Sequence, residues 1–176
     1  MKFAYRVMLV MSLALLLAAC AKDTQIQTPS PAAAPPADNT TPPQVDRLNP
    51  RDHTDPRNLD NPDSLLSQRV IYFDFDSSVI RQRGRDIIAA HAAYAGANAS
   101  ARITLEGHAD ERGSREYNLG LGERRGNAVQ SVMNGSGVGS SQMKVVSYGE
   151  ERPTCSSSSE GCLGQNRRVE ILYTSR

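Results

Sequence analysis

The residues that could bind or transform a ligand are concentrated between positions 108 and 125. His108, Asp110 and Glu111 offer one imidazole and two carboxylates, the groups that hold metal ions or transfer protons. A catalytic zinc, however, needs three protein ligands and an open position, and the other histidines, His53 and His91, lie in distant segments. The pattern therefore favours neither a metal site nor a catalytic residue, and we expect His108 to make a hydrogen bond at the end of a strand.

A helix face could present further polar groups to the same place. Asn118, Leu121 and Arg125 are spaced three and four residues apart, which puts them on one side of a helix. If that helix begins at Ser114, Arg125 lies ~16 Å along its axis. Asp110 and Arg125 can share a pocket only if the intervening loop folds back beside the helix, or if the helix begins later. We expect one of these two arrangements.

Composition and motifs exclude several classes of protein. The chain has 176 residues and a formal net charge of +1, whereas a nucleic-acid-binding domain usually carries a basic stripe. No Ser-His-Asp set has supporting motif context, and no glycine-rich phosphate loop or nucleophile elbow occurs. The sequence predicts a binding protein that is not an enzyme and needs no cofactor.

The elements that position these residues follow from hydrophobic periodicity. The predicted strands are 70–75, 102–106, 143–148 and 168–173, and the predicted helices are 81–97 and 114–133. This β-α-β-α-β-β order predicts an α+β sandwich with helices packed on one face of a mixed sheet, in a domain covering 64–176. Phe73 and Phe75 lie two apart on the first strand, so core packing is expected for both.

The N-terminal end has the features of an export signal. Lys2 and Arg6 precede an apolar run that extends to Ala19. The run is shorter than the roughly 20 residues that span a membrane, so residues 1–19 are predicted to be a signal peptide. The next residue, Cys20, completes a segment that resembles a bacterial lipobox, which implies a lipidated cysteine. Ala21, where Asp would favour the inner membrane, indicates anchoring in the outer membrane.

A proline-rich segment separates this cysteine from the predicted domain. Nine of the ten prolines lie between Pro29 and Pro62, and residues 20–63 show no sustained apolar period. Such a segment cannot offset the entropy of ordering it. It is predicted to be a disordered tether that spans ~35 Å as a flexible coil.

Two cysteines remain in the predicted domain. Cys155 and Cys162 flank a serine-rich stretch, and in an oxidising compartment we expect them to form a disulfide. Two free thiols, or pairing between chains, are the alternatives.

Several motifs together resemble one known family. The longest runs from Gly107 to Arg125, and shorter ones cover 73–76, 147–150 and 166–170. They resemble the outer-membrane protein A-like C-terminal domain family, and in particular its lipoprotein branch, the peptidoglycan-associated lipoproteins (Pal). The resemblance covers about 69–173, and the lipobox and tether match the lipoprotein branch as well.

The resemblance implies non-covalent binding to the diaminopimelate of the peptidoglycan stem peptide. That residue ends in an ammonium and a carboxylate on one carbon, so a binder needs an acidic group together with a guanidinium or backbone N–H donors. The family's ligand-binding positions fall on Asp110, Arg125, Asn118, Leu121, Phe75 and Asp76. From the residues alone, Asn118 could instead brace a loop and Leu121 could be core.

The resemblance also implies partners and a place in the cell. It predicts a domain that faces the periplasm from the outer membrane, a periplasmic β-propeller protein of the Tol–Pal system as a partner, and other outer-membrane proteins as further partners. The implied role is envelope integrity and cell division, with no nucleic-acid partner. A generic wall anchor without a Tol partner and a peptidoglycan hydrolase are the alternatives.

Overall fold

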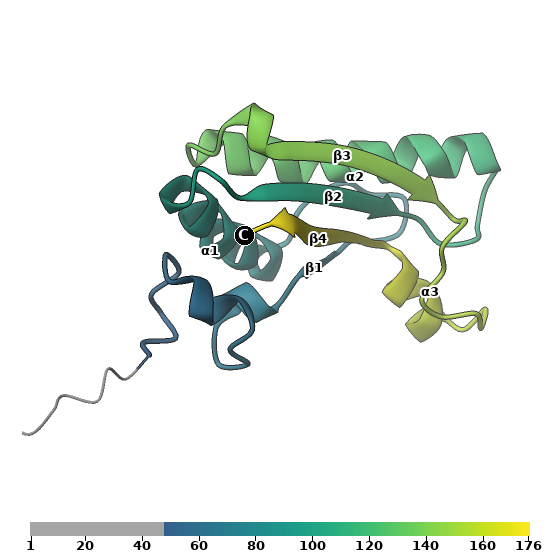
Figure 1. Ribbon diagram of the computed structural model, residues 1–176. Coiled ribbons are helices and arrows are strands. Elements are labelled where there is room, and N and C mark those ends of the chain that lie inside the picture. Colours follow the sequence, from purple (N-terminus) through teal and green to yellow (C-terminus); the bar gives the residue numbers. More distant parts are fainter. Residues whose placement is uncertain (1–47) are drawn as a thin grey trace, which may run out of the picture. The chain divides into compact units, whose positions relative to one another are not determined.

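The computed structural model describes residues 48–176 (Figure 1). The predicted signal peptide, the lipidated Cys20 and most of the predicted tether lie outside the described residues. The helices and strands are β1 (Val70–Tyr72), α1 (Gln82–Ala97), β2 (Arg102–His108), α2 (Arg115–Gly135), β3 (Met143–Gly149), α3 (Glu160–Asn166) and β4 (Arg168–Ser175). Three short 3-10 helices accompany them, at Pro56–Leu59, Leu65–Ser67 and Ser140–Gln142.

The four strands form one mixed sheet in the order β1-β4-β2-β3. β2 and β3 are parallel, because α2 carries the chain back between them, whereas β4 is antiparallel to both β1 and β2. α1 and α2 pack on the same face of the sheet (Figure 1). The predicted fold class is therefore confirmed. The short helix α3, between β3 and β4, was not predicted.

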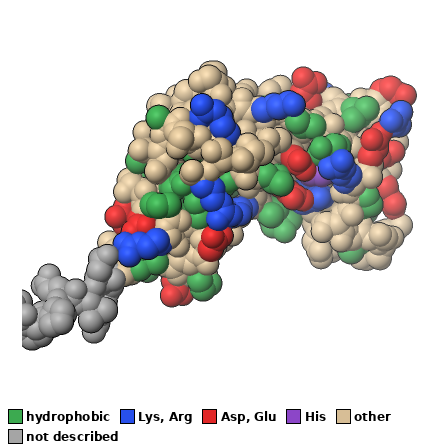
Figure 2. All heavy atoms as spheres, viewed as in Figure 1, with side chains coloured by type: hydrophobic (Ala, Val, Ile, Leu, Met, Phe, Trp, Pro, Cys, Tyr) green, Lys and Arg blue, Asp and Glu red, His purple; other side chains and the backbone are tan. Residues whose placement is uncertain are grey.

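The core lies between this sheet face and the two helices. It holds mostly aliphatic side chains from both helices and all four strands: Ile71, Ile87, Ile88, Leu105, Val129, Met133, Met143, Val169 and Ile171. On the opposite sheet face, charged side chains of both signs are mixed with apolar ones (Figure 2). No helix among residues 48–176 is long and apolar enough to cross a membrane.

Two glycines let α2 lie directly on the end of β2. A Cβ atom on Gly107 would collide with the carbonyl oxygen of Gly122, and a Cβ on Gly122 would come within 2.8 Å of the carbonyl oxygen of Gly107. Only a pair without side chains permits this backbone contact. It fixes where the loop after β2 starts relative to α2.

The first strand is shorter than predicted, which changes the environment of Phe75. Strand pairing ends at Tyr72, and the Phe73 N–H still donates to the carbonyl of Arg167. The chain then turns, with Asp76 in the left-handed region at φ 51°. Phe73 is buried, as expected for a core residue, but Phe75 is 55% exposed. The prediction of core packing for Phe75 was wrong because the strand alternation stops before it.

The folded part also begins earlier than the predicted boundary at residue 64. Asp55 caps the 3-10 helix Pro56–Leu59, and the side chain of Leu59 is only 1% exposed. Leu59 packs with Leu66 against Tyr94 of α1 in a second apolar cluster. The prolines and polar residues around Leu59 show no apolar period. The burial of this single leucine could therefore not be predicted from a segment with the composition of a linker.

We expect a fragment beginning at Ser64 to be less stable than one beginning at Val45. Losing Leu59 from the second cluster removes a fully buried leucine, which contributes ~2–3 kcal/mol. Urea unfolding of the two fragments measures the difference, and Leu59→Ala in the longer fragment is the matched control. Equal free energies of unfolding for both fragments would show that the early segment adds no stability.

Candidate functional site

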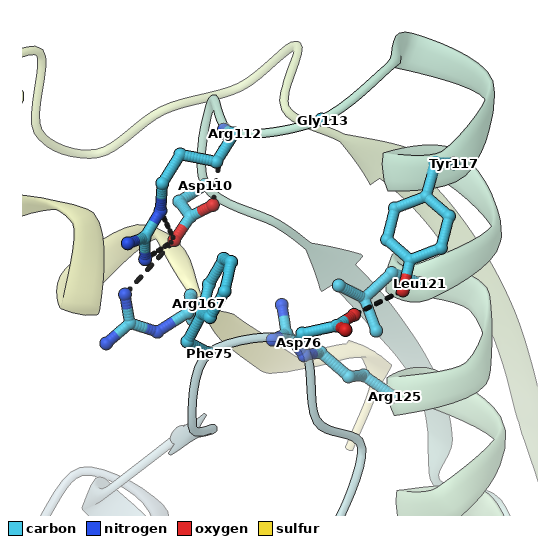
Figure 3. Close-up of a pocket in the computed structure, with 9 residues that line it drawn as sticks. All are labelled: Phe75, Asp76, Asp110, Arg112, Gly113, Tyr117, Leu121, Arg125 and Arg167. Atoms are coloured by element: carbon cyan, nitrogen blue, oxygen red, sulfur yellow. Dashed lines mark hydrogen bonds and ion pairs between the residues drawn. The ribbon is translucent and has the colours of Figure 1, made fainter.

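A pocket of about 160 Å³ opens where four parts of the chain meet. It is lined by the loop after β1, the loop between β2 and α2, the first three turns of α2, and the residue before β4 (Figure 3). The lining residues are Phe75, Asp76, Asp110, Arg112, Gly113, Tyr117, Leu121, Arg125 and Arg167. Asp110 and Arg125 therefore border one pocket.

The loop between β2 and α2 folds back beside the helix, which solves the distance problem posed by the sequence. α2 begins directly after Ser114, whose hydroxyl accepts from the N–H of Tyr117. Within the helix, the Asn118 amide donates to the carbonyls of Asp110 and Arg112, at 3.1 and 3.2 Å. Of the two expected arrangements, the fold-back is the one observed. Asn118 is the brace that holds it and is not among the pocket-lining residues.

Asp110 is the buried acidic group of the pocket, and two arginines hold it. Its side chain is 4% exposed. The carboxylate oxygen Oδ2 accepts from Arg112 Nη2 at 2.6 Å and from Arg167 Nη1 at 3.1 Å. Burial by itself would raise the pKa of Asp110, but the hydrogen bonds from these guanidinium groups outweigh it and hold the pKa below its usual value. Asp110 is therefore an ionised, paired carboxylate.

Arg125 lies beneath the pocket and is fully buried. Its guanidinium donates to three carbonyls, those of Ser77 (2.8 Å), His108 (2.8 Å) and Asp74 (2.9 Å). Burial lowers its pKa to about 10, which leaves the side chain charged at neutral pH. Arg125 thus ties the loop after β1 to the end of β2, a structural task that the sequence did not suggest.

The remaining walls of the pocket are largely apolar. Leu121 and Tyr117 project from α2, and the Tyr117 hydroxyl donates to the carboxylate of Asp76 (Figure 3). The ring of Phe75 lies against the guanidinium of Arg112, with 3.9 Å between the guanidinium carbon and the ring centroid. A narrow ligand with an aliphatic chain and charged ends fits such a lining.

A disulfide-closed segment supports the cationic side of the pocket. Cys155 and Cys162 are bonded, as predicted. The segment carries Glu160, which pairs with Arg112 at 3.4 Å and with Arg167 at 2.8 Å. Glu160 thus contacts both arginines that hold Asp110.

Sequence reasoning named five of the nine lining residues and missed four: Arg112, Gly113, Tyr117 and Arg167. Arg112 and Arg167 both stand inside motifs that the sequence displayed. The signal that could have found them is physical, because a buried carboxylate needs cationic partners. Arginines next to Asp110 and at the start of the last strand were the candidates.

His108 does not make the hydrogen bond expected of its side chain. Both ring nitrogens are buried and have no hydrogen-bond partner among the described residues. The ring stacks on Tyr148, with 5.6 Å between the ring centroids, while its backbone carbonyl accepts from Arg125. Desolvation lowers the pKa of His108 to about 4, so the imidazole is neutral. The nearest acidic group, the Glu170 carboxylate, lies 3.9 Å from Nε2, which is too far for a hydrogen bond.

We expect acidification to destabilise the domain through its buried histidines. His91 contacts the Tyr173 hydroxyl and the Gln68 carbonyl, at 2.8 and 3.0 Å, and its pKa, like that of His108, is lowered to about 4 by burial. In the unfolded chain both titrate near ~6.5. The unfolded state therefore binds more protons between these values, and the free energy of unfolding falls by at most ~1.4 kcal/mol per pH unit for each histidine.

Urea unfolding between pH 7.5 and 4.5 measures this dependence. His91→Gln keeps a neutral polar side chain and should show a shallower slope. A free energy of unfolding that is flat across this range would contradict the expectation.

No group of three His, Cys, Asp or Glu side chains that could hold a metal ion occurs in the part of the chain that the structure describes. The chemistry that the pocket offers is charge recognition, by the carboxylates of Asp76 and Asp110 and the guanidinium groups of three arginines.

Residues 72–167 match the OmpA family, and the chain belongs to this family. It is 44% identical over 108 residues to the peptidoglycan-associated lipoprotein of Pseudomonas putida, covering 61% of this chain and 64% of that one. It is 42% identical over 110 residues to the peptidoglycan-associated lipoprotein of Haemophilus influenzae, covering 61% and 72%. The resemblance to this family that the sequence motifs indicated is confirmed.

A solved structure agrees with the sequence matches. The crystal structure of the peptidoglycan-associated lipoprotein from Burkholderia pseudomallei matches with a TM-score of 0.65 and 39% identity, over 66% of this chain and 98% of that one. The OmpA match, residues 72–167, falls within the part of the chain that the structure describes.

Proposed function

We propose that this chain is an outer-membrane lipoprotein whose domain binds peptidoglycan without catalysis, through the diaminopimelate of the stem peptide. The observation that carries the proposal is the ionised Asp110 at the edge of a small pocket with apolar walls. The names of the relatives, which describe association with peptidoglycan, support it. Anchoring through Cys20 and a tether between anchor and domain belong to the same proposal.

The ammonium and the carboxylate at the end of the diaminopimelate side chain would meet two different groups of the pocket. Its ammonium pairs with Asp110, and its methylene chain lies between Phe75 and Leu121. The carboxylate on the same carbon faces the positive charge of Arg125. A guanidinium has five N–H donors, and three of those of Arg125 bind carbonyls, which leaves two for a ligand oxygen.

A pair of muropeptides that differ only at this residue tests the proposal. Diaminopimelate carries the end carboxylate, and lysine lacks it while keeping the ammonium. We expect the purified full-length protein in detergent to bind the diaminopimelate form about tenfold more tightly, because one charge-assisted hydrogen bond is lost with lysine. Equal affinities measured by calorimetry, or no binding of either, would contradict recognition at this end.

We further propose that the protein acts in the Tol–Pal system, with the periplasmic β-propeller protein of that system as its partner. The support is the similarity to peptidoglycan-associated lipoproteins over 61% of this chain in sequence and 66% in structure. Titration with the purified β-propeller protein of the same organism tests it. Absence of binding would favour a generic wall anchor.

A further inference from the structure

Asp110 is paired with the guanidinium of Arg112 in the folded domain. Arg112 donates to its carboxylate through Nε at 3.2 Å and Nη2 at 2.6 Å. The backbone N–H of Arg112 also reaches Oδ1, at 3.3 Å. A ligand ammonium that pairs with Asp110 must therefore share or replace these donors.

The second arginine at Asp110 is held from several sides. Arg167 donates to the carbonyl of Phe73 at 3.2 Å and to Glu160 at 2.8 Å, in addition to Asp110. Its side chain is only 10% exposed. Moving Arg167 would break contacts with three different parts of the chain, so it stays in place when a ligand arrives.

Arg112 is held far less firmly. Its side chain is 37% exposed, and beyond Asp110 its contacts are the outer face of Phe75 and a 3.4 Å pair with Glu160, which is itself mostly exposed. Figure 3 shows the guanidinium lying across Asp110 beside Phe75, at the edge of the pocket. The Arg112 side chain can therefore turn into solvent, and the buried Asp110 carboxylate would still accept from Arg167.

We propose that Arg112 is an internal competitor that occupies the ammonium position at Asp110 until the ligand exchanges with it. The inference rests on the proposed function, since it concerns the same pocket. It adds a determinant of specificity: only a ligand whose cation replaces the guanidinium at Asp110 can enter, and a neutral or acylated amine cannot. Arg112 keeps the buried carboxylate paired while the site is empty, and this lowers the apparent affinity for the wall.

The test compares the affinities of wild-type protein and Arg112→Met for a diaminopimelate muropeptide, with the full-length protein in detergent. Methionine keeps an aliphatic stem over Phe75 but removes the charge. Asp110 then retains Arg167, and we expect binding to become about tenfold tighter, because the ligand no longer displaces a charge-assisted hydrogen bond. A thermal melt confirms that the variant is folded, and Arg112→Lys, which retains a cation, should return the affinity toward that of wild type.

Arg115→Met is the matched control, since Arg115 pairs with Glu151 and is not among the pocket-lining residues. It removes the same charge and should leave the affinity within about twofold of wild type. A muropeptide whose side-chain amine is acetylated should show no gain with Arg112→Met.

The outcomes separate this inference from the proposed function. If wild type binds and Arg112→Met binds equally or more weakly, Arg112 is no competitor and instead contacts the ligand or has no role. An equal gain in affinity with Arg115→Met would show that the change in net charge causes the effect, and this would also overturn the inference. If neither wild type nor Arg112→Met binds, the proposed function and the inference fail together.

Discussion

Replacing Asp110 with asparagine is expected to weaken binding of a diaminopimelate muropeptide by about 100-fold, because truncating one partner of a buried ion pair costs ~2–5 kcal/mol. Asparagine has the same shape but carries no charge to match the ligand ammonium. It also offers the Arg112 and Arg167 guanidinium groups a weaker acceptor. Calorimetric titration of the full-length protein measures the loss.

The effect should fall on affinity far more than on folding. Arg167 keeps its contacts with Phe73 and Glu160, and Arg112 can turn to solvent, so neither cation is left buried and alone. Glu111→Gln is the matched control, because it removes a neighbouring exposed carboxylate that accepts from Ser158 instead of lining the pocket. If Asp110→Asn and Glu111→Gln bind equally well, Asp110 is not the group that recognises the ligand.

Arg125→Ala, in contrast, is expected to lower the free energy of unfolding by a large amount. The variant leaves three carbonyls without their donor and opens a cavity where a fully buried side chain stood. Two of those carbonyls belong to partly exposed residues and can find water, so we expect a loss of about 3 kcal/mol and not the full sum. Urea unfolding measures it.

Arg124→Ala is the control for this change, since it removes the same side chain from the exposed face of the same helix. The Arg124 guanidinium carbon lies 5.3 Å from the centroid of the Tyr117 ring, and a surface change of this kind costs less than ~0.5 kcal/mol. Arg125→Lys should be intermediate, because one ammonium cannot reach all three carbonyls. If Arg125→Ala is as stable as Arg124→Ala, Arg125 does not hold the pocket loops.

These two expectations assign different tasks to a pair of residues that the sequence had grouped together. The family resemblance implied that Asp110 and Arg125 act as the two charged contacts for one ligand. In the folded domain Arg125 binds three carbonyls around the pocket, and its contact with the ligand is a proposal. A loss of binding in Arg125→Ala is therefore interpreted together with the free energy of unfolding of that variant.

The sequence by itself determined the order of the four strands and the two long helices, the shared helix face of Asn118, Leu121 and Arg125, and the family. These features depend on local periodicity and contiguous motifs, which a chain displays without being folded. The Cys155–Cys162 disulfide was also predicted from the chain alone. The main predictions that were wrong concern short patterns, namely the end of β1 and the segment around Leu59.

Only the tertiary structure decided what each charged side chain does. Arg125 binds carbonyls 17, 48 and 51 positions away, and Arg167 reaches Asp110 across 57 positions. Burying a charge costs so much that its partners are fixed by whichever groups the fold brings within hydrogen-bond distance. Spacing along the chain carries no record of those distances, which is why Arg167 emerged as a partner of Asp110 only in the folded domain.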